Sequence, residues 1–155
     1  MAYVNVKASA IIPAAAERVY AVFSDYRVAH NEILPKPPFG DIEVEQGGTG
    51  AGTVFRVSST SWGTVQHYHM DVTEPQPGRV LIERDRNTDL VTTFTITPTA
   101  DPNKTNVQIV TRYTQKPGLA GWFDRVITPL LAPIIYRKEL RNVAAYLQQH
   151  QTITQ

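Results

Sequence analysis

The hydrophobic period of this chain changes once, and that change constrains the fold more than any other feature. Up to about residue 115, apolar residues recur mainly at alternate positions, which is typical of strands with one face in a core. From about Gly118 to His150 they recur at three- and four-residue steps, which indicates a long amphipathic helix. Pro129 and Pro133 lie inside this segment, so we expect a kink or break there.

Turn-forming residues divide the part before the helix into one strand, two short helices and six more strands. Pro13 ends the first strand and suits the first turn of a helix, while Ser24 and Asp25 are candidates for capping the second helix. A proline-rich run at 35–40 stops that helix. The expected strands lie at 3–12, 42–44, 53–59, 64–74, 79–86, 90–98 and 105–114. Their short connections favour a meander of antiparallel neighbours.

A sheet with one apolar face must bury that face, and the large partner available is the C-terminal helix. One helix is about 10–12 Å wide, whereas seven strands about 4.8 Å apart form a much wider sheet. We therefore predict an α+β fold in which a seven-stranded curved antiparallel sheet surrounds a long C-terminal helix, with two short helices after the first strand. The concave side then contains either bulky side chains that fill it or a cavity.

Composition narrows the classes of function. A chain of 155 residues fits a single domain, which we place at 1–155. Fifteen basic and fourteen acidic residues form no dense basic patch, so we expect no nucleic-acid partner. The chain has no cysteine, which excludes thiolate metal sites and cysteine nucleophiles.

The sequence has no signal-peptide pattern and no unbroken apolar run of about 20 residues. We therefore expect a soluble cytoplasmic protein with no integral membrane association. No oligomeric state is predicted.

The inward faces of the predicted strands carry aromatic and apolar side chains with a few hydroxyls. This pattern is typical of small-molecule sites, although the same aromatic residues can also pack a solid core. Tyr68 and Tyr113 stand out because a buried phenol needs a partner and can donate to a ligand carbonyl. The candidate ligand-binding residues are Phe55, Tyr68, Met70, Phe94 and Tyr113 on the strands and Trp122, Phe123, Val126 and Leu130 on the helix.

A charged cluster, Glu83–Arg86, ends one predicted strand, and alternation turns two of its side chains inward. On the side of Val80 and Ile82, Arg84 would enter the cavity and anchor a carboxylate or hydroxyl, so it joins the candidate ligand-binding residues. The alternative is a strand end that reaches solvent, where the charges stay hydrated.

Two histidines raise the question of a metal site. His67, His69 and Asp71 share one strand face, and a His-x-His pair there can chelate a divalent ion. That face is opposite to the one of Tyr68 and Met70, which suit the core. We therefore place both histidines on the convex, wet side of the sheet and predict no metal and no other cofactor.

The segment Gly47–Gly52 is rich in glycine and joins two predicted strands. A phosphate-binding loop of this kind needs a helix N-terminus, and the sequence indicates none here. We therefore expect these glycines to form a flexible lip of the sheet.

Several segments together match a known pattern. They are Ile11–Tyr20 leading into Phe23–Tyr26, Gly50–Thr53 before a strand, Val72–Glu74 followed by Pro75 and Pro77, Phe94–Pro98, and the closing helix from Gly118. In these features the chain resembles the START and polyketide cyclase-like (SRPBCC) superfamily over nearly its whole length. The resemblance implies the helix-grip fold and a ligand cavity. The superfamily includes lipid, sterol and polyketide binders, aromatase/cyclases, quinone-binding proteins and plant hormone receptors, with no shared catalytic signature.

Three functions remain open from the sequence. The first is a non-catalytic carrier or sensor of a small hydrophobic ligand (a lipid, isoprenoid or polyketide-like molecule), which we favour because the sequence contains no recognisable catalytic motif. The second is an enzyme of the polyketide cyclase or dehydratase type, in which Tyr68, Tyr113 or Arg84 would polarise carbonyls or move protons. The third is a module that contacts a protein or membrane surface through the helical tail or Trp62.

Overall fold

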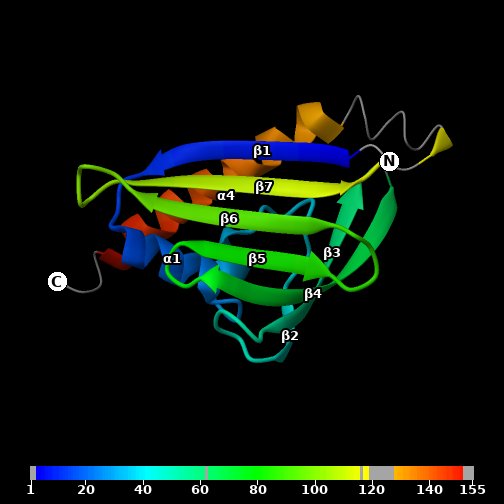
Figure 1. The fold of residues 1–155 in the computed structure, drawn as a ribbon, viewed down its shortest axis with the longest axis horizontal. Coiled ribbons are helices and arrows are strands. Elements are labelled where there is room, and N and C mark those ends of the chain that lie inside the picture. The colour runs from blue at the N-terminus through cyan, green and yellow to red at the C-terminus, as the bar shows by residue number, and fades with distance from the viewer. Residues whose placement is uncertain (1–2, 62, 116, 119–127, 152–155) are drawn as a thin grey trace.

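The computed structural model describes residues 3–61, 63–115, 117–118 and 128–151 of the chain. Its strands form an antiparallel sheet that curls around the helices (Figure 1). The strands are β1 (Tyr3–Ile12), β2 (Glu43–Gln46), β3 (Val54–Ser61), β4 (Thr64–Gln76), β5 (Val80–Asp85), β6 (Val91–Pro98) and β7 (Thr105–Thr114). The described helices are α1 (Ala16–Ser24), α2 (Ala29–Ile33) and α4 (Thr128–Gln151).

The order of the strands across the sheet is β1-β7-β6-β5-β4-β3-β2. Each strand from β2 to β6 pairs antiparallel with the next strand in the sequence, so the predicted meander is confirmed. The first strand then pairs antiparallel with the last, with Ala8 opposite Ile109. The last strand, β7, therefore lies beside the first strand, β1, and α4 contacts this side of the sheet at β1 (Figure 1).

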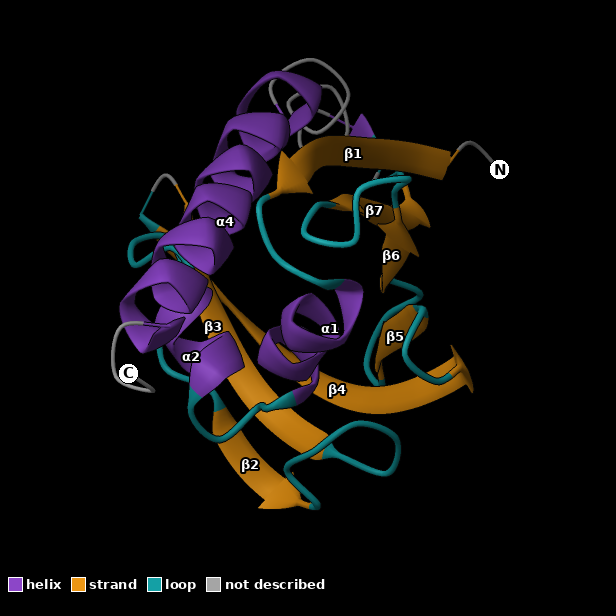
Figure 2. Cartoon of the chain, turned by 90° about the vertical axis from the view of Figure 1, so that its left-hand side faces the viewer, coloured by secondary structure: helices purple, strands orange, loops and turns teal. Residues whose placement is uncertain are grey.

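Helix α4 lies on the concave side of the curled sheet, with α1 and α2 beside its C-terminal half (Figure 2). The amide Nδ2 of Asn142 on α4 donates to the carbonyl oxygen of Ile33 on α2 over 2.9 Å, and this bond ties the two helices together. Of the predicted kink or break, a break is wrong at Pro133, because helix α4 continues through this residue. Residues 119–127 of the predicted helix lie outside the described residues. No described helix combines the length and the apolar character needed to cross a bilayer.

Aromatic side chains from α1 and from the turn between α1 and α2 pack against the inner face of the sheet. The ring of Phe23, which is fully buried, lies 5.1 Å from the ring of Phe94 on β6, and the ring of Tyr26 stacks on Phe55 of β3 at 4.8 Å. The N-cap residue of α2 is Val28, not the predicted Ser24 or Asp25, although the carboxylate of Asp25 accepts hydrogen bonds from the amides of Val28 and Ala29 where the helix begins. These contacts place α1 and α2 at one end of the concave side and leave the other end to α4.

The glycine-rich loop between β2 and β3 is bonded to the rest of the fold, in contrast to the predicted flexible lip. The amide of Gly50 donates to the carbonyl of Ser24 over 2.9 Å, and the amide of Tyr26 donates to the carbonyl of Gly48 over 2.9 Å. Gly50 has a positive φ of 60°, and a Cβ atom there would lie 2.1 Å from a carboxylate oxygen of Glu74. The glycine is therefore needed for close approach as well as for the turn.

Candidate functional site

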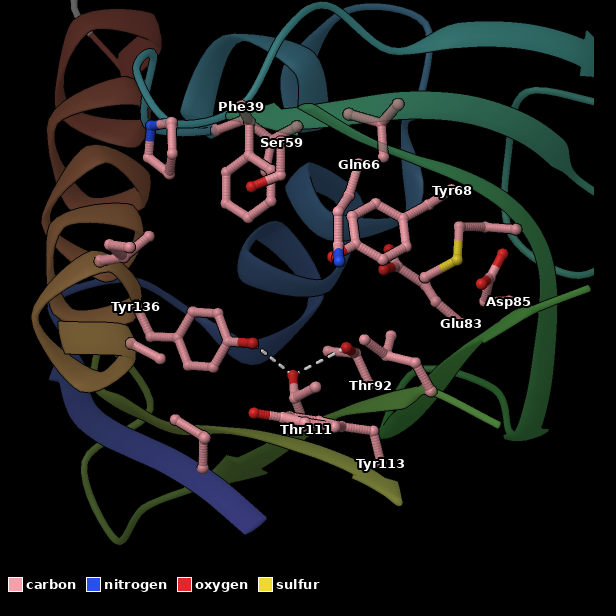
Figure 3. Close-up of a pocket in the computed structure, with 18 of the residues that line it drawn as sticks. Phe39, Ser59, Gln66, Tyr68, Glu83, Asp85, Thr92, Thr111, Tyr113 and Tyr136 are labelled. Atoms are coloured by element: carbon pink, nitrogen blue, oxygen red, sulfur yellow. Dashed lines mark hydrogen bonds between the residues drawn. The ribbon is translucent and has the colours of Figure 1, made fainter. Parts of the chain in front are cut away.

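A cavity of about 680 Å³ lies between the concave face of the sheet and α4 (Figure 3). Side chains from β3, β4, β5, β6 and β7 form its walls, and residues of α2 and α4 close it. Of the two possibilities that the sequence left open, a filled interior and a vacant one, the structure shows the vacant one.

Five of the predicted ligand-binding residues meet at this cavity. Phe55, Tyr68, Met70, Phe94 and Tyr113 all line it, and each comes from the inner face of a strand. The reason is that the predicted phase of alternation is correct for β3, β4, β6 and β7. Figure 3 shows Tyr68 and Tyr113 on different walls, both beside the open space.

Arg84 does not reach the cavity, so its predicted inward orientation is wrong. It is exposed on the outer face of the sheet, in a shallow groove with Ile82. The pairing of β5 with β6 sets this orientation, because Glu83 lies opposite the inward-facing Thr92. The inward side chains of the charged cluster are Glu83 and Asp85, both of which line the cavity.

Helix α4 presents a different stripe to the cavity from the one predicted. Leu130, a predicted ligand-binding residue, is 65% exposed and does not line the cavity, so its predicted placement is wrong. Trp122, Phe123 and Val126 lie outside the described residues, and their place in the site stays a prediction. The α4 residues that line the cavity recur at helical spacing and are Thr128, Ala132, Ile135, Tyr136 and Glu139.

A row of hydroxyl groups crosses the wall next to α4. Thr92 Oγ1 and Thr111 Oγ1 are 2.8 Å apart, and Thr111 is also hydrogen-bonded to the phenol of Tyr136 (Figure 3). Burial raises the pKa of Tyr136, so the phenol stays protonated. The row therefore keeps its hydroxyl protons and forms a polar strip on an otherwise apolar wall.

Buried ionisable side chains form a second polar feature, which we call the acid cluster: His30, Glu83 and Glu139. The imidazole Nε2 of His30 lies 3.6 Å from Glu139 Oε1 and 3.9 Å from Glu83 Oε1. Its other nitrogen, Nδ1, is 2.6 Å from the carbonyl oxygen of Phe23. The phenol of Tyr26 donates to Glu83 Oε1 over 2.9 Å. All three members of the cluster line the cavity.

Burial sets the electrostatics of the acid cluster. It raises the pKa of Glu83 to about 7, against a smaller opposing effect of His30 and of the Tyr26 hydroxyl. For His30, burial lowers the pKa, but the neighbouring Glu139 and Glu83 outweigh burial and the net pKa is raised. Burial also raises the pKa of Tyr26, so its phenol remains a donor to Glu83. The cluster therefore contains groups that exchange protons near neutral pH.

The opposite end of the cavity reaches the surface at the strand connections. Its lining there includes the exposed Gln66, His67 and Thr88. His67 was predicted on the convex side but lies at this rim. His69 is half-buried on the outer side, with its Nε2 2.9 Å from Glu45 Oε2. The cavity thus runs from a wet rim at the hairpins to the buried acid cluster.

The acid cluster was not predicted from the sequence, because its members occupy positions that usually hold apolar residues. A signal existed for two of them. Glu83 shares a strand face with the buried Leu81, and Glu139 lies one helical turn from Tyr136 and Val143 on the buried stripe of α4. No periodic pattern marks His30, whose position depends on how the five-residue helix α2 packs.

The comparisons with known proteins agree with this architecture. The chain belongs to the family described as polyketide cyclase / dehydrase and lipid transport, whose sequence model matches residues 3–148. This match confirms the predicted START and polyketide cyclase-like superfamily. Family and fold together fit a protein that binds a hydrophobic ligand or resembles polyketide cyclases. No curated protein matches the sequence.

Solved structures show the same fold over almost the whole chain. The solution structure of KanY protein has 27% sequence identity and a TM-score of 0.81, and covers 96% of this chain and 99% of its own. The Zhui aromatase/cyclase from Streptomyces sp. R1128 has 18% identity and a TM-score of 0.68, with coverage of 96% and 95%. A START superfamily protein from Mycobacterium smegmatis has 16% identity and a TM-score of 0.68, with coverage of 94% and 97%.

The raised pKa of Glu83 predicts how stability varies with pH. Its carboxyl titrates near 4.5 in the unfolded chain and near 7 in the folded protein, so the folded state binds the proton more tightly between these values. The free energy of unfolding should therefore fall as pH rises through this window, with a Glu83 contribution on the order of 2 kcal/mol. In Glu83→Gln, where the amide oxygen can still accept from Tyr26, this fall should shrink by that amount in urea titrations at about pH 5 and pH 8.

Glu43→Gln on the exposed face of β2 is the matched control, and it should follow the wild-type dependence on pH. An unchanged fall in the unfolding free energy of Glu83→Gln would show that Glu83 is not the group that titrates in this window.

Proposed function

We propose that this protein is a non-catalytic cytoplasmic carrier or sensor that binds a small hydrophobic ligand in the cavity between the sheet and α4. The observation that carries the proposal is the vacant, mostly apolar space of about 680 Å³, whose walls include Phe55, Met70 and Phe94. Ligand sites of small molecules usually measure about 300–1,000 Å³ and have such walls. The family description, which includes lipid transport, supports the same proposal.

The polar strip of the cavity favours a ligand with oxygen functions over a plain hydrocarbon. Three hydroxyls, those of Thr92, Thr111 and Tyr136, share two hydrogen bonds among them. Three O–H protons serve two bonds, so one proton is left for an acceptor on the ligand. A polyketide-like or isoprenoid molecule with a carbonyl would use that donor, and its carbon skeleton would contact the apolar walls.

A fluorescent probe tests this proposal directly. The neutral probe N-phenyl-1-naphthylamine should bind the wild-type protein and gain fluorescence, because the cavity removes its apolar surface from water. Val57 lines the cavity, so Val57→Trp should fill part of the space and weaken binding about tenfold. Val65, which is 50% exposed and does not line the cavity, provides the same substitution as a control, and Val65→Trp should bind like wild type.

Thermal unfolding of both variants checks that they fold. A folded Val57→Trp protein that binds the probe as tightly as wild type would place the probe elsewhere and would count against a ligand site in this cavity.

A second candidate function, an enzyme of the polyketide cyclase type, is supported by the acid cluster. His30, Glu83 and Glu139 place an imidazole and two carboxyl groups, the kinds of group that act as general acids and bases, beside a cavity of substrate size. The aromatase/cyclase among the structural neighbours has the same fold, which makes this chemistry compatible with the architecture. The reaction class would be removal of a proton next to a ketone: the proton moves to Glu139 Oε1 and the C–H electron pair moves toward the carbonyl oxygen.

Hydrogen exchange distinguishes this enzyme from a carrier. Proton NMR in heavy water would follow loss of the signals next to the carbonyl of 4-phenyl-2-butanone. An enzyme should accelerate this loss at least about tenfold over buffer, and Glu139→Gln should abolish the acceleration while Glu43→Gln preserves it. A rate equal to that of buffer would exclude this chemistry for simple ketones and favour the carrier.

The third candidate, a surface-interaction module, depends on Trp62 and the helical tail; Trp62 lies outside the described residues.

A further inference from the structure

We propose that the buried end of the cavity selects ligands by their head group: it accepts a hydrogen-bond donor, best a protonated amine, at Glu139, and it rejects carboxylates. This inference rests on the proposed function, because it assigns the head group of the molecule that the cavity holds. Three observations on the acid cluster and the rest of the lining support it.

The first observation is the sign of the ionisable groups around the cavity. Four residues with carboxyl groups line it: Glu83, Asp85, Asp89 and Glu139. The described part of the lining contains no lysine and no arginine. A ligand carboxylate would therefore enter a site of its own charge in which His30, already shared by Glu83 and Glu139, is the one buried side chain of the described lining that can carry a positive charge, and a buried unpaired charge is costly. An ammonium group would instead meet an excess of negative charge.

Hydrogen bonding leaves the charge on two of these carboxylates in place. Asp85 accepts from the hydroxyl of Thr88 over 2.7 Å and from the amide of His69 over 2.9 Å. Asp89 accepts from the amide and the hydroxyl of Thr114. These donors are uncharged, so they hold the carboxylates in place without adding a positive charge, and the bonds from Thr114 also lower the pKa of Asp89.

The second observation is that one oxygen of Glu139 lacks a hydrogen-bond partner. The residue is 3% exposed, and Oε1 accepts no hydrogen bond within the described structure. The nearest cationic candidate, Nε2 of His30, is 3.6 Å away, which is too long for a hydrogen bond. Buried polar atoms in native proteins nearly always have a partner. Because Glu139 lines the cavity, a donor on the ligand can supply the missing bond.

The third observation is that His30 cannot balance the site. Nδ1 lies 2.6 Å from the carbonyl of Phe23, so this nitrogen carries a proton and donates. The remaining nitrogen faces both Glu83 and Glu139, so at most one positive charge is shared between two carboxylates. Glu83 also receives the phenol of Tyr26. Glu139 is therefore the carboxylate of the cluster that still lacks a donor.

A matched series of naphthalenes tests the inference. 1-Naphthylmethylamine, 1-naphthalenemethanol and 1-naphthoic acid have the same ring system and differ mainly in the head group. Isothermal titration at about pH 7 should rank the amine above the alcohol and the alcohol above the acid, with the amine at least about tenfold tighter than the acid. Equal or tighter binding of the acid would overturn the inference.

Substitution at Glu139 identifies the responsible group. Glu139→Gln retains the shape of the side chain but removes its charge, so the ratio of amine to acid affinity should fall at least about fivefold, while the alcohol should bind within about threefold of wild type. Glu43→Gln removes the same charge from the outer surface and should leave the ratio unchanged. A ratio that is the same in Glu139→Gln and wild type would overturn the role of Glu139.

The alcohol separates the inference from the proposed function. If the alcohol binds and the acid binds equally well, the cavity holds ligands without selecting the head group, and only the inference fails. If none of the three naphthalenes binds, the proposed function fails together with the inference.

Discussion

One α-helix is about 10–12 Å across, whereas a sheet of seven strands spaced about 4.8 Å apart is several times wider. The sheet therefore packs its concave face on α4 only by curling, and even then the helix leaves part of that face uncovered. The short helices α1 and α2 and the turn between them fill one end, through contacts such as Phe23 on Phe94 and Tyr26 on Phe55. The space that remains is the cavity of about 680 Å³.

The cavity has both apolar walls and buried ionisable groups, so the packing of the fold also sets the electrostatics of the site. Burial disfavours charge, yet Glu83 and Glu139 lie on the inner surface with His30 between them. Part of the desolvation is offset by the Tyr26 hydroxyl and by the shared imidazole. Groups that are expensive to bury are usually retained for a function. In this protein they distinguish the deep end of the cavity from the purely apolar walls.

The fold could be predicted from the sequence because the period of the apolar residues and the positions of the turn residues are local signals. Alternation alone correctly predicted that Phe94 and its neighbours on β6 face inward. On β5 the same rule failed, since both faces of that strand carry apolar residues, and only the pairing with β6 places Glu83 inside and Arg84 outside. The sequence rules also assign charged residues such as Glu139 to the surface. His30 depends on the packing of α2, which no local pattern specifies.

The central claim is that a ligand enters the space between the sheet and α4. The methyl group of Met70 is the NMR probe that reports on that space most directly. It is one of two methionines in the chain, it is 4% exposed, and it lines the cavity. In protein labelled with ¹³C at the methionine methyl groups, 1-naphthalenemethanol should shift the Met70 methyl signal and give nuclear Overhauser effects between that methyl and the ring protons. Binding of the alcohol with an unperturbed Met70 methyl signal and no such effects would contradict the account.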